Sequence, residues 1–169
     1  MKRTVALVAT AILLAGCSTA PAPAPAVEHV TKQIGESAGL VTDSGQPKVE
    51  FVILAIRKDF TCSANPDLTS ANGNFVAVEM EVATADTLAP DVFRTGRDTF
   101  AILGPDGVLE TDLAGNAEGC LKDEEKMLEQ VEPGQRVTGT VVLDSRNTSG
   151  RLIFSQESPG GRGWVWDFA

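Results

Sequence analysis

The residues best suited to catalysis are four carboxylates in one stretch of the chain: Asp106, Glu110, Asp112 and Glu118. Paired carboxylates can hydrolyse glycosidic bonds, one as general acid and the other as base or nucleophile. A glycan site also uses aromatic platforms, and this chain has no Tyr and two Trp. Trp164 and Trp166 alternate near the C-terminus, which favours a role in the core. A carboxylate-dependent hydrolase of cell-wall glycans is therefore only an alternative prediction.

Other catalytic machinery is poorly represented. Nucleophilic catalysis needs a positioned base, most often histidine. The one histidine, His29, falls in a segment that we expect to be a solvated linker. The glycine-rich residues 160–163 are expected to join two strands, so they do not read as a phosphate-binding loop at a helix N-terminus. The sequence therefore predicts no enzyme activity and no cofactor.

Metal binding has weak support in the sequence. Asp112, Asn116 and Glu118 could supply oxygen ligands to calcium, but their spacing does not match an EF-hand loop. A zinc site would need more than two cysteines without a nearby histidine. A lipoprotein that binds a metal or a small molecule is kept as a further alternative. Asn147 begins an Asn-Thr-Ser triplet that fits the N-glycosylation pattern, which matches often by chance.

The third kind of chemistry lies at Cys17. Lys2 and Arg3 precede an apolar run at residues 5–15, which is long enough for a signal peptide and too short to cross a bilayer. Residues 14–17 read Leu-Ala-Gly-Cys, which resembles the lipobox of bacterial lipoproteins at all four positions. The resemblance implies that residues 1–16 are removed and that Cys17 carries a diacylglyceryl group. Two acyl chains hold a protein firmly on a membrane.

The anchor predicts the organisation of the rest of the chain. Residues 17–47 are predicted to be the lipidated cysteine and a disordered Pro/Ala-rich tether, with a short helix over 27–34 as an alternative for that part. Residues 48–169 are predicted to form one domain on the extracytoplasmic face of the cell membrane. The net charge of −9 argues against nucleic acid as a partner.

With Cys17 acylated, Cys62 and Cys120 remain as an even pair. Export places them in an oxidising compartment, where we expect a disulfide. Closing the loop between Cys62 and Cys120 would contribute about 4 kcal/mol to stability in the chain-entropy model. Two buried thiols or a metal site are the alternatives that the sequence leaves open.

The remaining pattern is that of a β protein. Apolar and β-branched residues form strand-like runs separated by Gly, Pro and Asn turns, at residues 49–58, 71–84, 98–113, 134–144, 151–156 and 163–168. One stretch, 116–130, suggests a loop or a helix. About seven short strands with few helices predict an immunoglobulin-like antiparallel β-sandwich, with a closed barrel as the alternative.

Two motifs carry a family resemblance, GNFVAV at 73–78 and PGQRVTGTVVL at 133–143. With the leader and the strand order, residues 49–168 resemble the telokin-like, immunoglobulin-like domains of secreted bacterial lipoproteins, which include relatives of the mycobacterial immunoprotective extracellular protein. An asparagine that usually closes the first of these strands is absent here. The resemblance implies a fold and a location, and no activity.

These features together predict a non-enzymatic, lipid-anchored domain that binds a cell-envelope or extracellular protein. Sandwich loops or a sheet edge would carry the contact. The loop at 114–130 is the expected place, because it is the longest and most charged connection and contains Cys120.

Overall fold

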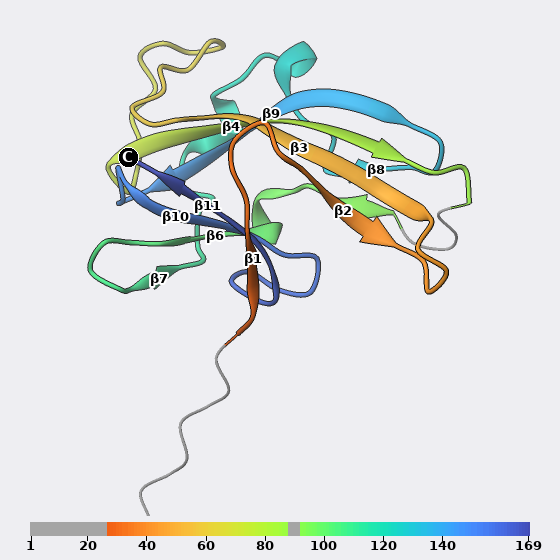
Figure 1. Ribbon diagram of the computed structural model, residues 1–169. Helices are drawn as coiled ribbons and strands as arrows, with labels where there is room; N and C mark the ends of the chain where they lie inside the picture. The colour runs from red at the N-terminus through yellow and green to blue at the C-terminus, as the bar shows by residue number, and fades with distance from the viewer. Residues whose placement is uncertain (1–26, 88–91) are drawn as a thin grey trace, which may run out of the picture.

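Two β-sheets packed face to face form the domain in the computed structural model, which describes residues 27–87 and 92–169 (Figure 1). The first sheet has the order β1-β11-β10-β6-β7 and comprises β1 (His29–Thr31), β11 (Gly163–Phe168), β10 (Gly150–Phe154), β6 (Phe100–Leu103) and β7 (Leu109–Glu110). The second has the order β2-β3-β4-β9 and comprises β2 (Ser37–Val41), β3 (Pro47–Arg57), β4 (Asn74–Thr84) and β9 (Arg136–Ser145).

Short elements fill the connections between the sheets. A two-stranded sheet pairs β5 (Phe93–Arg94) with β8 (Gln130–Val131). Three 3-10 helices lie within the connections: η1 (Arg97–Thr99) between β5 and β6, and η2 (Ala117–Gly119) and η3 (Asp123–Glu125) between β7 and β8. Within residues 27–87 and 92–169, no helix is long and apolar enough to cross a membrane.

The main core lies between the sheets, as the alternating patterns predict. Alternate residues of β4, from Val76 to Val82, are fully buried, and Trp166 is buried with them. Phe51 is the centre of an aromatic cluster, with ring centroids 4.8 Å from Trp164 and 5.2 Å from Phe154. Edge-to-face contacts of this kind add to the stabilisation that burial provides. The two tryptophans therefore pack in and against the core, as expected.

A second apolar cluster lies on the outer face of the four-stranded sheet. It combines Phe75 and Ala77 of β4 and Val142 of β9 with both cysteines. Burial on both faces explains why the first half of β4 is apolar throughout, whereas Glu79 and Glu81 in its second half reach the surface. The loop that contains Cys120 covers this half of the sheet.

The prediction of a tether through residue 47 is wrong for the described part, 27–47. β1 pairs with β11 in parallel, and β2 pairs with β3. An edge strand exposes unpaired N–H and C=O groups, and these segments pair with them although their apolar periodicity is poor. The predicted short helix over 27–34 is wrong for the same reason. The sandwich is thus antiparallel except at β1, and it has more strands than expected.

Candidate functional site

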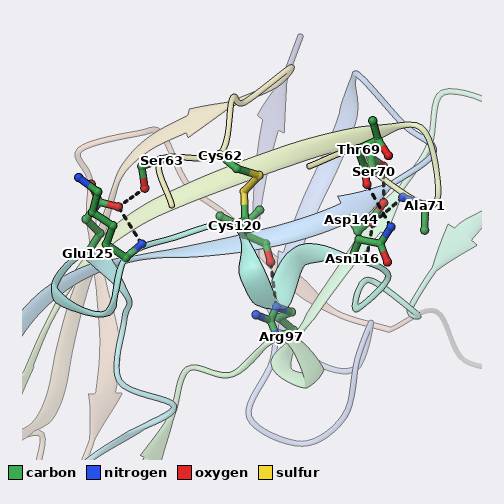
Figure 2. The surroundings of a disulfide bond; sticks show 12 residues. Cys62, Ser63, Thr69, Ser70, Ala71, Arg97, Asn116, Cys120, Glu125 and Asp144 are labelled. Atoms are coloured by element: carbon green, nitrogen blue, oxygen red, sulfur yellow. Dashed lines mark hydrogen bonds between the residues drawn. A yellow bond between two sulfur atoms is a disulfide. The ribbon is translucent and has the colours of Figure 1, made fainter. Parts of the chain in front are cut away.

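The disulfide between Cys62 and Cys120 fixes the centre of the predicted binding loop (Figure 2). Both cysteines are almost fully buried, and they pack on Phe75 and Val142 of the sheet beneath. The bond connects the segment after β3 to the segment between η2 and η3. Two long connections that are far apart in the sequence therefore form one surface.

Asp144, near the end of β9, binds the same two connections through hydrogen bonds to its carboxylate. It is fully buried, and its Oδ2 accepts hydrogen bonds from the backbone N–H of Ala71 at 2.8 Å and of Asn116 at 2.7 Å. Its Oδ1 accepts one from the N–H of Asn72 at 2.9 Å and one from the hydroxyl of Ser70. One carboxylate thus satisfies four donors from two loops (Figure 2).

The hydrogen bonds determine the charge state of Asp144. Burial alone would raise its pKa, but the hydrogen bonds from Ser70, Asn116, Ala71 and Asn72 outweigh this and lower the pKa below its ordinary value of 3.8. The group is therefore ionised at neutral pH. Its role is to hold the loops, because its lone pairs face protein donors.

Charged contacts fix the rest of the loop. The Arg97 side chain donates from Nη1 to Glu118 at 2.8 Å and from Nε to the carbonyl of Val142 at 3.0 Å. The hydrogen bond and charge of Arg97 lower the pKa of Glu118. Ser63 donates to Glu125, and this bond lowers the pKa of Glu125. Arg97, Ser63 and Cys62 therefore each connect this loop to another segment of the chain.

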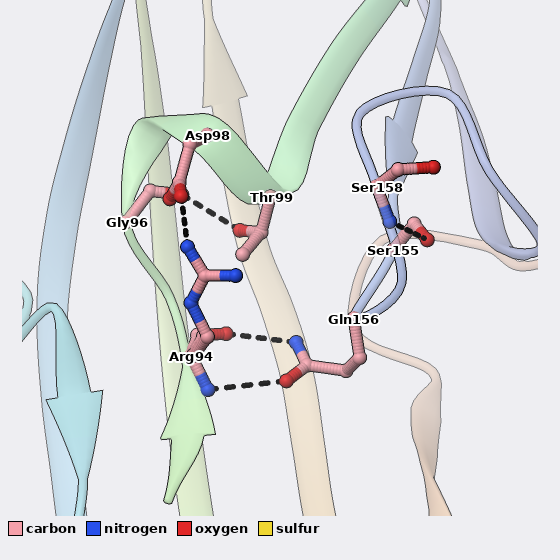
Figure 3. A network of polar contacts seen from close by, with 7 residues as sticks. All are labelled: Arg94, Gly96, Asp98, Thr99, Ser155, Gln156 and Ser158. Carbon is pink, nitrogen blue, oxygen red and sulfur yellow. Dashed lines mark hydrogen bonds and ion pairs between the residues drawn. The ribbon is translucent and has the colours of Figure 1, made fainter.

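The segment before η1 is held in turn by the loop after β10 (Figure 3). Gln156 accepts a hydrogen bond from the backbone N–H of Arg94 at 3.1 Å and donates one to the Arg94 carbonyl at 2.8 Å. The side chain of Arg94 pairs with Asp98. The backbone of Arg94 is thus held by the loop after β10, and the Arg97 side chain is held by the Val142 carbonyl of β9.

Three hollows border the loop. The first, of about 370 Å³, lies between 94–98 and 111–114 and is lined by charged groups of both signs, among them Arg94, Asp98 and Asp112. The second, of about 80 Å³, shares Arg97 with it and reaches inward to Met127. The third, of about 610 Å³, lies on the outer face of the sheet and contains Glu124. We refer to residues 94–98, 111–130 and 60–63 as the loop surface.

Three of the four candidate catalytic carboxylates have partners of their own, and these partners differ. Glu110 accepts hydrogen bonds from Ser145 at 2.6 Å and from Asn147 at 2.8 Å. Asp106 accepts from the N–H of Val108 in its own turn, Glu118 pairs with Arg97, and Asp112 lines the first hollow. Nothing in these contacts gives the carboxylates a shared site for acid and base.

The other candidate residues also have structural partners. Asn116 donates from its side chain to the carbonyl of Thr69 at 3.0 Å, and Glu118 is paired with Arg97. In residues 27–87 and 92–169, no three His, Cys, Asp or Glu residues are grouped to hold a metal ion. Asn147 is buried and donates to Glu110, so it is not an accessible glycosylation site. His29 contacts the carbonyl of Gly161 at 3.1 Å in the sandwich, instead of lying in a linker.

The sequence did not single out Asp144 or Arg97. The only available signal for Asp144 was an acid at the end of an apolar strand, VVLD, in a β protein with an Asn-Gly turn at 72–73. Cys17, the predicted lipidation site, lies outside the described residues.

The comparisons with known proteins concern the fold. The chain is similar to the crystal structure of MPT63, a secreted protein from Mycobacterium tuberculosis, with a TM-score of 0.54 and 13% identity over 85% of this chain and 100% of that chain. No family model matches the sequence, and no curated protein matches it. The predicted immunoglobulin-like β-sandwich is confirmed, and at this identity the similarity extends to nothing further.

Proposed function

We propose that this chain is a lipid-anchored, extracytoplasmic, non-enzymatic domain that binds a protein of the cell envelope through the loop surface. The observation that carries the proposal is the rigid construction of that surface. The Cys62–Cys120 disulfide and the buried Asp144 carboxylate hold two loops in place. Three hollows lie side by side at these loops, and side chains of both charge signs are exposed in the first of them.

The proposed location has three supports. The sequence at 14–17 resembles a lipobox, and a disulfide of this kind forms in oxidising compartments. The similar protein MPT63 is described as secreted. Acylation of Cys17 is tested by the intact mass of the membrane-extracted protein and by its partition into detergent. The Cys17→Ser variant should lack the acyl mass and enter the aqueous phase, whereas an unmodified wild-type mass would refute the anchor.

The proposed partner is a protein because of the chemistry of the hollows. The first and third hollows are open to solvent, and charged side chains of both signs line them beside Leu113, Phe60 and Leu121, so they lack the enclosed apolar walls that small-molecule pockets have. Interfaces of transient complexes are polar in this way. Leu128, which is 47% exposed in the same loop, supplies an apolar contact.

The partner is tested by crosslinking in cells with the native anchor, followed by mass spectrometry of the captured proteins. We expect a reproducible crosslinked protein that is lost when Glu124→Lys and Leu128→Ser are combined. Asp167→Lys, an exposed acid on the five-stranded sheet, is the matched control and should keep the crosslink. A crosslink that survives the loop variant, or the absence of any, would refute binding through this surface.

A further inference from the structure

Exposed apolar side chains are concentrated in the N-terminal part of the described chain. Five of the nine large hydrophobic residues that are exposed in the described chain lie between residues 27 and 41: Val27, Val30, Ile34, Leu40 and Val41. Val41 is the most exposed, at 64%. An apolar concentration of this kind on a small domain marks a surface that contacts something.

Three of these residues surround a groove at an open side of the sandwich. β1 is the edge of one sheet and β2 is the edge of the other. Between them lies a groove of about 430 Å³, lined by Val30, Leu40 and Val41 and by Trp164. We call these four residues the apolar edge. Trp164 pairs with Val30 in the sheet and contacts Phe51 in the core, so the groove leads from the surface toward the centre of the domain.

The charged groups beside the apolar edge are few and of both signs. Lys32 pairs with Glu36 at 2.7 Å, and Glu50 accepts a hydrogen bond from Ser37 at 2.7 Å. No cluster of basic residues accompanies the groove within the described part of this segment. The surface therefore fits an apolar phase and has nothing that selects anionic headgroups.

The position of the anchor identifies that phase. From Cys17 to Val27 the chain has about ten residues, which reach at most about 35 Å even when fully extended. A domain attached at Cys17 therefore has a bilayer within reach of its first strand at all times. Docking is then an intramolecular event, and a small apolar contact is enough to favour it.

We propose that the apolar edge rests on the bilayer that holds Cys17, with Val30, Leu40 and Val41 in the interfacial region and the groove open to the acyl chains. The inference rests on the proposed lipid anchor. Apolar side chains at such interfaces enter the boundary between headgroups and acyl chains by about 5–10 Å. The edge strands are covered by lipid headgroups and water on one side, so their polar backbone groups stay hydrated.

This orientation has a consequence for the loop surface. In Figure 1 the chain enters β1 at the bottom of the view, and the teal segment around η2 and η3 lies at the top. A domain resting on its N-terminal edge directs the part of the loop surface around η2 and η3 away from the membrane. The proposed partner would then meet the domain from the side opposite the bilayer.

Trp164 provides a native probe of the contact. The mature, acylated chain is reconstituted in phosphatidylcholine vesicles whose acyl chains carry bromine, which quenches tryptophan on contact. We expect quenching of the emission, and its loss in Trp164→Phe, because Trp166 is buried. The combined variant Val30→Ser, Leu40→Ser and Val41→Ser should lose it too, while still floating with the vesicles.

Controls separate this inference from the anchor. Val108→Ser with Leu109→Ser removes exposed apolar groups from the β6–β7 hairpin and should leave the quenching unchanged. The single variant Val41→Ser, at the most exposed position, should reduce quenching without affecting folding. A wild-type protein that floats without being quenched would overturn membrane docking, and so would quenching that persists in the serine variant or requires phosphatidylglycerol. A protein that does not float refutes the anchor, and with it the premise of the inference.

Discussion

Replacement of Asp144 by Asn tests whether one buried carboxylate holds the loop surface. Each of its oxygens accepts two hydrogen bonds, from Ala71 and Asn116 on one side and from Asn72 and Ser70 on the other. An amide keeps one oxygen and turns an NH₂ group toward the other two donors. Two bonds to a charged acceptor are lost, each worth about 1.5–3 kcal/mol, so we expect a cost of about 4 kcal/mol in unfolding free energy.

The assay is urea unfolding at neutral pH, followed by tryptophan fluorescence. Ser70→Ala is the graded control, because it removes one hydroxyl donor and should cost about 1.5 kcal/mol. Crosslinking through the loop surface should fall in parallel with the loss of order at 69–73 and 114–116. An Asp144→Asn protein within about 1 kcal/mol of the wild type would refute the reasoning.

The same variant has a pH dependence whose sign is fixed by the pKa. The pKa of Asp144 is lower in the folded state than the ordinary 3.8. Its contribution to stability is therefore complete above that ordinary value and is lost as the pH falls through the folded pKa. The difference between the wild type and Asp144→Asn should be constant near neutrality and shrink in acid, because a protonated carboxyl also presents one donor. A difference that grows in acid would contradict the assignment.

Three further predictions concern stability. Replacing Cys62 and Cys120 by Ala opens a cross-link over 58 residues and should cost about 4 kcal/mol, measured by urea unfolding, and alkylation without reductant should label neither cysteine in the wild type. Gly139→Ala places a Cβ 2.6 Å from the backbone of Met127, so we expect faster amide exchange at 126–128, and unchanged exchange there would contradict this contact. Phe51→Ala removes the centre of the aromatic cluster and should lower the free energy of unfolding by about 4 kcal/mol, which thermal unfolding would record as a lower Tm. A decrease below about 1 kcal/mol would mean that the core is not arranged as described.

Alternation of apolar residues was enough to predict the sandwich. Val76, Val78, Met80 and Val82 occupy one side of β4, and they are buried as the period of two requires. The hairpin around residues 104–107 and the glycine-rich connection at 160–163 also follow from turn chemistry. These features are local, so the sequence contains them directly.

The edge strands could not be predicted in the same way. Residues 29–31 and 37–41 have neither strong β propensity nor clean alternation, and they are strands because β11 and β3 offer unpaired backbone groups. Composition placed the start of the domain after residue 47, too late in the chain. A backbone partner distant in sequence leaves no local pattern.

The sequence by itself determined that this is a β protein with a pair of cysteines available for a disulfide. Tertiary structure alone decided which polar residues matter. Asp144, Arg97 and Gln156 resemble ordinary surface residues in the sequence, yet each fastens segments from different parts of the chain. They matter because the packed sheets bring donors and acceptors from distant parts of the chain to hydrogen-bond distance, about 3 Å. The fold sets such long-range pairings, and the neighbouring residues in the sequence do not.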